Sequence, residues 1–535
     1  MAGISLEDPK QFMISWTSYG NELLDPGADD RLGAEFAKQL TDANVATESF
    51  WPEIAKYGTA YNLLGVLRKV SLERMPALET LFRRAARRDV FDTARVPGIP
   101  LDDGSWQRIK ALQQDGRLYE IDLKLLESLT VRHYENHGKK LLRFNPATVT
   151  LLEMTKGQSL LPFLIWVYRG HSDRGTAVTP TGEEFYSRDR STEGAWLYAL
   201  QASKSSITLY GIWLGHVYYW HIVSAAMQRT MKEAIRSSKH PIQMLLAPQS
   251  EYLIQFNRTL LGKSSDFHDI APPTWIFEPE VVLKLLDAFA EEREFFDDDP
   301  YTQLAQNGLK VENFTNSREK PWDLFPVAQN LLRIWDICER FVQAFVLKFY
   351  PDNAAVTRDT GLQNWMKAAG DPAQGNIRGL PKMDNPGALT RVLTSQVYRL
   401  TVHGVSRLPR SADPWLTFVA NFPPCLQRDD LPSRYANLSA LELLKYLPNV
   451  GTIAEITQFY FIFAFTKPYA SLLPRGSMNN DPYFPKEMFD LETALTAYRN
   501  RMLTFMTKFT KAQTPSGFAV PDVGEGLQWP RNIEL

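Results

Sequence analysis

The apolar stretch from residue 196 to residue 235 constrains the fold of this chain more than any other feature. It reads WLYALQASKSSITLYGIWLGHVYYWHIVSAAMQRTMKEAI and carries apolar or small residues on nearly every face of a helix. A helix that is hydrophobic all round is buried in the core of a large protein. Hydrophobic residues make up 44% of the 535-residue chain, which is enough for such a core. We therefore predict one long central helix inside a mostly α domain.

Two of the chain's eight histidines, His216 and His221, lie in this helix. Their neighbours are apolar and aromatic, so both imidazoles are expected to be buried, and a metal ion is one partner for a buried ring nitrogen. On a regular α-helix five residues turn through about 500°, which leaves the two side chains roughly 140° apart. A local π-bulge has a wider turn and brings residues i and i+5 together. The pair therefore indicates either a metal site on a π-bulge or two core histidines.

Two other histidines and one acidic run are candidates for special roles. His403 lies in the helical, largely apolar segment VYRLTVHGVSR, so it is a candidate third ligand, the alternative being a core histidine. His240 opens HPIQMLLAP and is followed by proline, which predicts local turn structure there. The run EEREFFDDDP at 291–300 lacks the ligand spacing of a calcium loop. We predict that this run is a solvated helix end.

Helical periodicity and turn residues organise the rest of the chain. The segments NPATVTLLEM and LLPFLIWVYR flank the turn KGQS and predict a β-hairpin within a small β element near 117–190. Helical patterns are found at 30–90 (including YNLLGVLRKV at 61–70), at 323–350, at 387–408 and at 486–510. The chain thus reads as one large, mainly α domain.

Composition and the lack of common motifs exclude several classes of protein. With 59 basic and 61 acidic residues, the chain lacks the basic surplus of a nucleic-acid-binding protein. No secretory signal is visible, and no apolar run approaches the roughly 18 residues of a membrane span. Cys338 and Cys425 form neither a disulfide framework nor a CxxC zinc pair, which favours a reducing, cytoplasmic location. No GxGxxG, P-loop, GxSxG or HExxH motif is present.

In their order along the chain, the motifs resemble the catalytic domain of lipoxygenases. The family pattern is a buried helix with His-x4-His, an HPI-x-x-LL-x-P segment, a later helical His-x3-Asn/His and a terminal carboxylate that binds the metal. This chain is similar at His216 and His221, at HPIQMLLAP (240–248), at His403 and at its ending WPRNIEL. EGAWLYALQASKSS and LQNWMKAAGD also resemble family segments. The resemblance implies a mainly α lipoxygenase-like catalytic domain with a long central metal-bearing helix and a small β element.

The resemblance also implies a metal site and a reaction. The iron ligands would be His216, His221, His403 and the terminal carboxylate of Leu535, with the three histidines forming the catalytic centre. Neutral imidazoles and a carboxylate suit non-haem iron, with manganese as an alternative. The implied activity is a dioxygenase that abstracts hydrogen from a polyunsaturated fatty acid and inserts O2 to give a hydroperoxide. The implied partners are this apolar substrate and O2, with no nucleic acid, no transmembrane segment, and a peripheral membrane contact left open.

Three features depart from the family pattern. Four residues after His403, where the family has a weak ligand, this chain has Arg407, whose guanidinium has no lone pair to offer a metal. Leu260 stands where the family has a small residue that helps steer oxygen, so we assign both residues to the substrate pocket. Residues 1–116 read as a helical N-terminal region packed on a catalytic domain at 117–535. The chain would then be a minimal form without the β-barrel lipid-binding domain of eukaryotic members.

Two alternatives to fatty-acid oxygenation follow from these departures. Arg407 and Leu260 change the immediate surroundings of the metal and of oxygen, which favours a lipoxygenase-fold metalloenzyme that oxidises a non-lipid substrate. The missing fifth ligand favours a metal-poor protein that binds a ligand without catalysis. The three retained histidines and the terminal carboxylate argue against this last reading.

Overall fold

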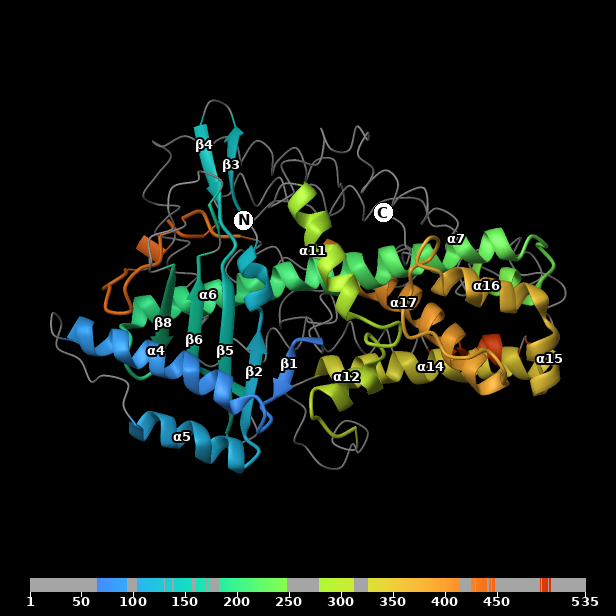
Figure 1. Cartoon of the computed structure of the whole chain (residues 1–535), viewed down its shortest axis with the longest axis horizontal. Helices are drawn as coiled ribbons and strands as arrows, with labels where there is room; N and C mark the ends of the chain where they lie inside the picture. The colour runs from blue at the N-terminus through green and yellow to red at the C-terminus, as the bar shows by residue number, and fades with distance from the viewer. Residues whose placement is uncertain are drawn as a thin grey trace.

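The computed structural model describes the chain over residues 65–93, 103–128, 130–136, 139–155, 160–169, 171–172, 182–247, 279–311 and 326–412, and over parts of 425–447 and 491–501. Within these ranges the long central helix is present. It comprises α6 (Glu193–Tyr210), the π-helical segment η4 (Gly211–Val223) and α7 (Ser224–Ala234), which follow one another without a break across the molecule (Figure 1). Almost all of α6 is buried, so the prediction of one long buried helix is confirmed.

The helix begins at a side-chain cap. The hydroxyl oxygen of Thr192 accepts a hydrogen bond from the backbone N–H of Ala195 at 3.3 Å, which satisfies one of the free donors of the first turn. The same hydroxyl donates to the carbonyl of Ala436 at 2.5 Å. The start of the central helix is therefore fixed to the chain near residue 436.

A five-stranded antiparallel sheet packs against α6. Its order is β1-β2-β5-β6-β8, with β1 at Leu67–Lys69, β2 at Leu118–Asp122, β5 at Ala147–Met154, β6 at Leu160–Tyr168 and β8 at Glu183–Ser187. A smaller sheet has the order β4-β3-β7, with β3 at Thr130–Asn136, β4 at Lys139–Arg143 and β7 at His171–Ser172. In Figure 1, α6 lies behind the larger sheet and α4 (Met75–Thr93) lies in front of it. The predicted hairpin is confirmed as β5 and β6, which pair antiparallel with Leu151 opposite Leu164.

One helical prediction is wrong. The segment at 61–70 was expected to be helical, but Leu67–Lys69 forms β1 and pairs with β2, with Leu67 opposite Ile121. Short apolar runs do not distinguish a helix from a strand by periodicity alone. Here the pairing with β2 determines that the segment is a strand, because Leu67 and Ile121 are both fully buried in the paired sheet.

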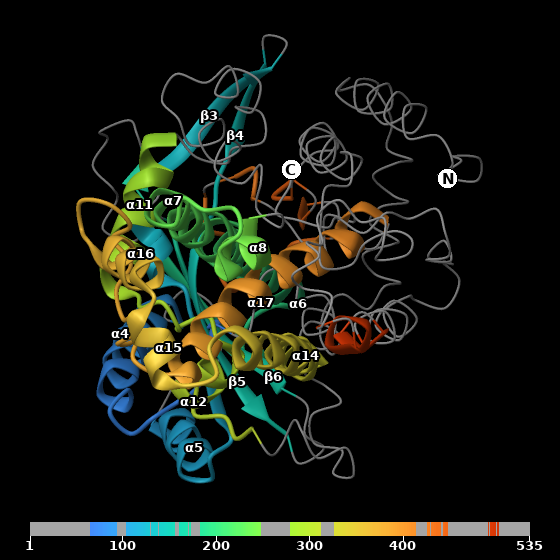
Figure 2. The same ribbon diagram turned by 90° about the vertical axis from the view of Figure 1, so that its right-hand side faces the viewer.

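The remaining helices lie at both ends of the central helix. α5 and the 3-10 helix η3 accompany the sheet, and the others gather along η4 and α7 (Figures 1 and 2). Their bounds are α5 Asp103–Gln114, η3 Lys124–Ser128, α8 Pro241–Leu246, α11 Pro279–Glu292, α12 Pro300–Gln306, α14 Pro326–Phe349, α15 Asn353–Arg358, α16 Thr360–Gly370 and α17 Pro386–Ala412. The helices predicted at 323–350 and 387–408 are confirmed as α14 and α17. Of the helix predicted at 486–510, residues 493–498 are helical and the rest lies largely outside the described residues.

The packing places η4 between the two halves of the molecule. α6 packs on strands β5, β6 and β8, α7 packs on α16, and α17 packs on both α14 and η4. The mainly α prediction is therefore confirmed, and the π-helical segment lies where the sheet half meets the helical half. None of the helices described is long and apolar enough to cross a membrane.

We expect Gly194 to be essential for the start of the central helix. A Cβ at this position would lie 2.0 Å from the backbone carbonyl oxygen of Leu438, far inside van der Waals contact. Gly194→Ala should therefore lower the free energy of unfolding by about 1–3 kcal/mol, the usual cost of overpacking. Gly370→Ala is the matched control, because its nearest neighbours would be at 3.8 and 4.0 Å. Denaturant unfolding checks both variants, and equal stability would contradict this packing.

Candidate functional site

The π-helical segment η4 carries two of the predicted ligand positions. It runs from Gly211 to Val223 and therefore includes both His216 and His221. The wider turn of a π-helix places residues i and i+5 on the same face. The sequence predicted only a local bulge at this point, whereas the structure has 13 residues in this conformation. His221 is buried, with 4% of its surface exposed.

The end of η4 is held by backbone and side-chain hydrogen bonds. The backbone N–H of Ser224 donates to the carbonyl of His221, and the Ser224 hydroxyl donates to the carbonyl of Tyr219 at 3.5 Å. A wide turn disturbs the regular hydrogen-bond ladder where it reverts to an α-helix. The Ser224 hydroxyl satisfies a carbonyl at this junction, which stabilises the change of helix type next to His221.

Aromatic side chains surround the middle of η4. Tyr218 and Tyr219 are buried and both contact Phe289 of α11 edge to face, with ring centroids 5.1 and 6.0 Å apart. Burial raises the pKa of Tyr218 to about 12, although the positive charge of Arg399 acts in the opposite direction. The phenols therefore stay neutral at physiological pH, and this side of η4 is an apolar environment with little water.

The other predicted site residues fall in different categories. Positions 403 and 407 lie on α17, the helix that packs against η4. The structure describes only the backbone of His216, His403 and Arg407. Leu260 and Leu535 lie outside the described residues. The predicted ligand set therefore stays a prediction.

Donor chemistry links the predicted ligands to a non-haem iron site. Among the side chains that the structure describes, no group of three His, Cys, Asp or Glu could hold a metal. The backbone of η4 places positions 216 and 221 on one face, and α17, the helix that carries position 403, packs against η4. Imidazole nitrogens with one carboxylate are a ligand set that suits non-haem iron.

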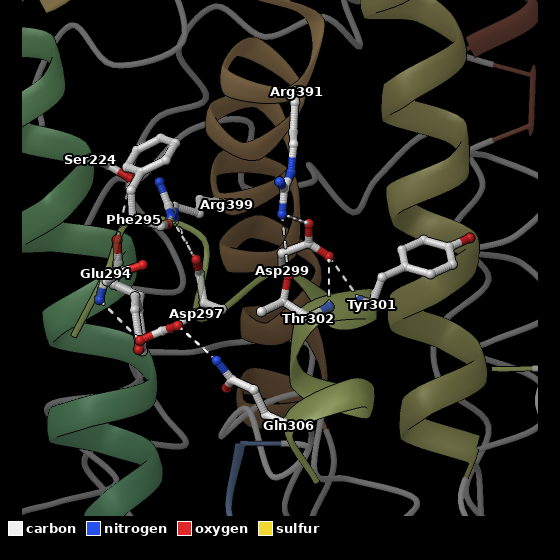
Figure 3. Close-up of polar contacts among 12 residues, drawn as sticks. Ser224, Glu294, Phe295, Asp297, Asp299, Tyr301, Thr302, Gln306, Arg391 and Arg399 are labelled. Atoms are coloured by element: carbon white, nitrogen blue, oxygen red, sulfur yellow. Dashed lines mark hydrogen bonds and ion pairs between the residues drawn. The ribbon is translucent and has the colours of Figure 1, made fainter. Parts of the chain in front are cut away.

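The prediction that the acidic run at 291–300 is a solvated helix end is right for Glu291 and Glu292, which are exposed at the end of α11, and wrong for the loop that follows. α11 ends at Glu292, and the following loop buries Asp298 and Asp299, which are 2% and 4% exposed. Asp298 accepts hydrogen bonds from Arg399 of α17 at 2.7 and 2.5 Å. The sequence predicted exposure to solvent, because a run of charged residues usually forms a solvated face. Here arginines from a distant helix compensate the buried carboxylates (Figure 3).

The second aspartate of this loop has a different role. Asp299 caps α12, since its carboxylate accepts the backbone N–H groups of Tyr301 at 2.8 Å and Thr302 at 3.3 Å. It also lies 3.6 Å from Arg391, whose guanidinium stacks 4.0 Å from the ring centroid of Phe296. The loop is thus tied to α17 at two points.

A third polar cluster fixes the HPI segment. His240 caps α8, because its Nδ1 accepts the backbone N–H of Ile242 at 3.3 Å. The proton is therefore on Nε2, which donates to the carboxylate of Asp359 at 3.0–3.1 Å. Asp359 also accepts the Tyr350 hydroxyl at 2.7 Å and the N–H of Leu362 at 2.9 Å. The local structure predicted for His240 is confirmed, and the cluster joins α8 to α14 and α16.

Two buried glutamines lie on the helices next to the predicted metal site. Gln228 of α7 and Gln396 of α17 are fully buried, and their amide groups have no hydrogen-bond partner in the described part of the chain. Gln228 lies seven residues after His221, and Gln396 lies seven residues before His403. On the α-helix α17 a separation of seven residues returns close to the same face, so position 396 and position 403 share a face.

A family model described as lipoxygenase matches residues 144–433, which is more than half of the chain and includes η4 and α17. The chain belongs to the lipoxygenase family. Among its relatives, a human polyunsaturated fatty acid lipoxygenase is 24% identical over 417 residues, covering 74% of this chain and 58% of the human protein. Chloroplastic lipoxygenase 7 of Oryza sativa subsp. japonica is 28% identical over 174 residues, covering 31% of this chain and 19% of the rice protein. The chain thus matches less than two thirds of the length of these relatives.

Solved lipoxygenases share the fold. A fungal lipoxygenase from Fusarium graminearum superposes with a TM-score of 0.67 at 12% identity, over 97% of this chain and 90% of the fungal one. A calcium-dependent 11R-lipoxygenase gives a TM-score of 0.63 at 17% identity, over 88% and 64% of the two chains. The predicted lipoxygenase-like catalytic fold is therefore confirmed.

Sequence reasoning missed three residues that make polar contacts between distant segments of the chain: Asp298, Asp359 and Arg399. The sequence does contain a signal for Asp299, the neighbour of Asp298. An aspartate directly before a proline is typical of a helix N-cap, and Asp299 precedes Pro300. Asp359 also directly precedes a helix, α16, but threonine and not proline follows it. No local signal identifies Arg399, whose partner is 101 residues away in the sequence.

We expect Asp359 to make the stability of this lipoxygenase depend on acid. Burial raises the pKa of its carboxyl group, but hydrogen bonds from His240, Leu362 and Tyr350 outweigh burial and lower the pKa to about 2. A carboxylate with a lowered pKa stabilises the fold above its ordinary pKa of 3.8, and this contribution is lost as the pH falls toward 2. Asp359→Asn should lower the free energy of unfolding by about 1–3 kcal/mol at neutral pH.

Unfolding measured between pH 7 and pH 2 checks this expectation. The loss of stability in acid should be smaller in Asp359→Asn than in the unchanged protein. Asp352→Asn is the matched control, because Asp352 caps α15 through Ala355 at 2.7 Å and asparagine caps helices equally well. If both variants followed the same pH curve, the His240–Asp359 cluster would have no special role.

Proposed function

We propose that this chain is a non-haem iron dioxygenase that inserts O2 into a polyunsaturated fatty acid to give a hydroperoxide. The observation that carries the proposal is the buried π-helix η4, which holds positions 216 and 221 on one face in a chain of the lipoxygenase family. A thirteen-residue π-helix is a rare conformation, and π-helical turns occur frequently at functional sites.

The proposed ligands are the imidazoles of His216, His221 and His403 and the terminal carboxylate of Leu535. Iron bound by this set would supply the one-electron oxidation that removes a hydrogen atom from a bis-allylic methylene group. Manganese is the alternative metal. The protein's own part is to orient the acyl chain and to exclude water from the radical, for which the aromatic surroundings of Tyr218 and Phe289 are suited.

We assign Arg407 and Leu260 to the substrate pocket. Arg407 cannot bind the metal, because a guanidinium stays protonated and has no free lone pair. It suits an anionic group instead, such as the carboxylate of a fatty acid. Support for this substrate class comes from relatives, which include a human polyunsaturated fatty acid lipoxygenase and a lipoxygenase solved in complex with arachidonate at a TM-score of 0.63 and 17% identity.

We expect the purified protein to contain close to one iron per chain and to consume O2 with linoleic or arachidonic acid. The product should be a conjugated diene hydroperoxide, measured by ultraviolet absorption and mass spectrometry. His221→Ala should reduce both the iron content and the rate at least a hundredfold, because it removes one ligand of four.

Two variants serve as controls for this experiment. Adding one residue after Leu535 should also abolish iron binding, because it converts the terminal carboxylate into an amide. His240→Ala should lower stability but retain iron, since His240 has a structural partner in Asp359. An iron-containing protein that oxidises no fatty acid would refute the proposed substrate, and a protein that never takes up metal would refute the proposed site.

A second candidate function is the oxidation of a non-lipid, polar substrate on the same fold. Gln228 and Gln396 favour it, because buried amide groups need a hydrogen-bond partner and a purely apolar acyl chain offers none. Each buried polar group without a partner costs about 1–3 kcal/mol. A polar ligand or an ordered water molecule at these amides would recover this energy.

Gln396→Met tests the second candidate. If the amide serves no ligand, the variant should raise the free energy of unfolding by about 1 kcal/mol and leave fatty-acid oxygenation unchanged. Gln363→Met is the matched control and should be destabilising, because the Gln363 amide donates to the carbonyls of Val356 and Met383 at 3.0 and 2.8 Å. Loss of oxygenation or of stability in Gln396→Met would show that the amide binds a polar partner.

A further inference from the structure

We propose that Arg399 is a positioning residue whose buried ion pair with Asp298 fixes the rotation of α17 against the π-helix η4. By doing so it orients the part of α17 that carries His403 and Arg407. The inference rests on the proposed function in so far as it takes position 403 as a metal ligand. It concerns a residue that lies one helical turn before that position.

The geometry of Arg399 leaves its guanidinium little freedom. The side chain is fully buried, and its Nε and Nη2 donate to the two carboxylate oxygens of Asp298 at 2.7 and 2.5 Å. Nη2 also donates to the backbone carbonyl of Phe295, and the guanidinium carbon lies 4.3 Å from the centroid of the Phe295 ring. A bidentate pair combined with stacking fixes both the plane and the direction of the side chain.

A buried pair of this kind is not explained by stability alone. Removing two charges from water costs as much as their attraction returns, so well-packed apolar residues of similar volume are often equally stabilising. Contacts between apolar side chains, however, depend little on the relative orientation of the two groups. The hydrogen bonds from Nε and Nη2 of Arg399 to Asp298 and Phe295 require a defined orientation of α17 relative to the loop between α11 and α12, so the pair specifies that orientation, whereas Nη1 has no partner in the described part of the chain.

The pair lies at the junction of the elements that build the site. Figure 3 shows Arg399 projecting from α17 toward the loop that carries Phe295, with Ser224 of the central helix beside it. Its charge acts on Tyr218 of η4, and α17 packs directly on η4. Catalytic groups must be held to within about an ångström, since a misplacement of that size can cost a hundredfold in rate.

The same loop and helix contain an exposed counterpart. Arg391 lies eight residues before Arg399 on α17, stacks on Phe296 and approaches Asp299 at 3.6 Å. Its side chain is 51% exposed, whereas that of Arg399 is fully buried. The two arginines share helix, loop and partner types, and they differ in burial and in distance from position 403. Arg391 is therefore a matched control.

The test replaces the buried pair without leaving a lone charge. Arg399→Met combined with Asp298→Leu should keep the melting temperature within a few degrees of the unchanged protein. We expect kcat for linoleic acid to fall at least tenfold with KM changed less than threefold. The electron paramagnetic resonance spectrum of the ferric form should broaden, and iron should be released faster to a chelator. Arg391→Met should leave kcat, spectrum and iron release within twofold of the unchanged protein.

Each outcome decides the inference. A folded double variant with unchanged spectrum, iron release and kcat would overturn it, and so would equal effects in Arg391→Met. Should the double variant not fold, Arg399→Lys replaces it: a single ammonium keeps the charge but loses the bidentate geometry, so the spectrum should still change, and an unchanged spectrum would overturn the inference. If the unchanged protein binds iron but oxidises no fatty acid, the proposed function fails, while the spectrum and iron release still test Arg399.

Discussion

The π-helical hydrogen bonding of Gly211–Val223 is the constraint on which the rest of the structure depends. A π-helix is less favourable than an α-helix and persists only where its surroundings determine it. The sheet supports the preceding helix α6, and α16 and α17 support the following helix α7. Aromatic rings from Tyr218, Tyr219 and Phe289 fill the space around the middle of η4. The wide turn thus lies between the regular helices α6 and α7 and packs against α11 and α17.

Several polar interactions among the described residues lie where helices begin. Thr192, His240, Asp299 and Asp359 each accept a backbone N–H at the start of a helix, and each also reaches another element. The apolar core alone would allow neighbouring helices to slide or rotate, because dispersion contacts carry little direction. Buried caps and ion pairs supply direction at a small net cost. The helices around η4 are therefore held in defined orientations as well as in contact.

The sequence predicted the local structure of this chain better than its long-range contacts. The apolar helix, the hairpin of β5 and β6 and the helices α14 and α17 follow from periodicity. The spacing of His216 and His221 indicated a local π-bulge as one of two readings, and the structure has a longer π-helix there. β1 could not be predicted, because its strand pairing depends on β2 far along the chain. The burial of Asp298 could not be predicted either, since the acidic composition predicts exposure to solvent and the arginine that compensates its charge is on another helix. The ligand set came from family resemblance, which periodicity could not have supplied.

The arginines of α17 connect these observations to the chemistry of the site. Positions 391, 399 and 407 follow one another at eight-residue intervals, and each interval turns the side chain by about 80° on a regular α-helix, so Arg391 and Arg399 lie on neighbouring faces. The first two guanidiniums meet the same kind of environment, a phenylalanine ring and an aspartate. A guanidinium is charged at every accessible pH and must meet an anion wherever it is shielded from water. If Arg407 lies close to the proposed metal, it needs such an anion there, and an anionic group of the substrate would supply it at the position where the family has a weak metal ligand.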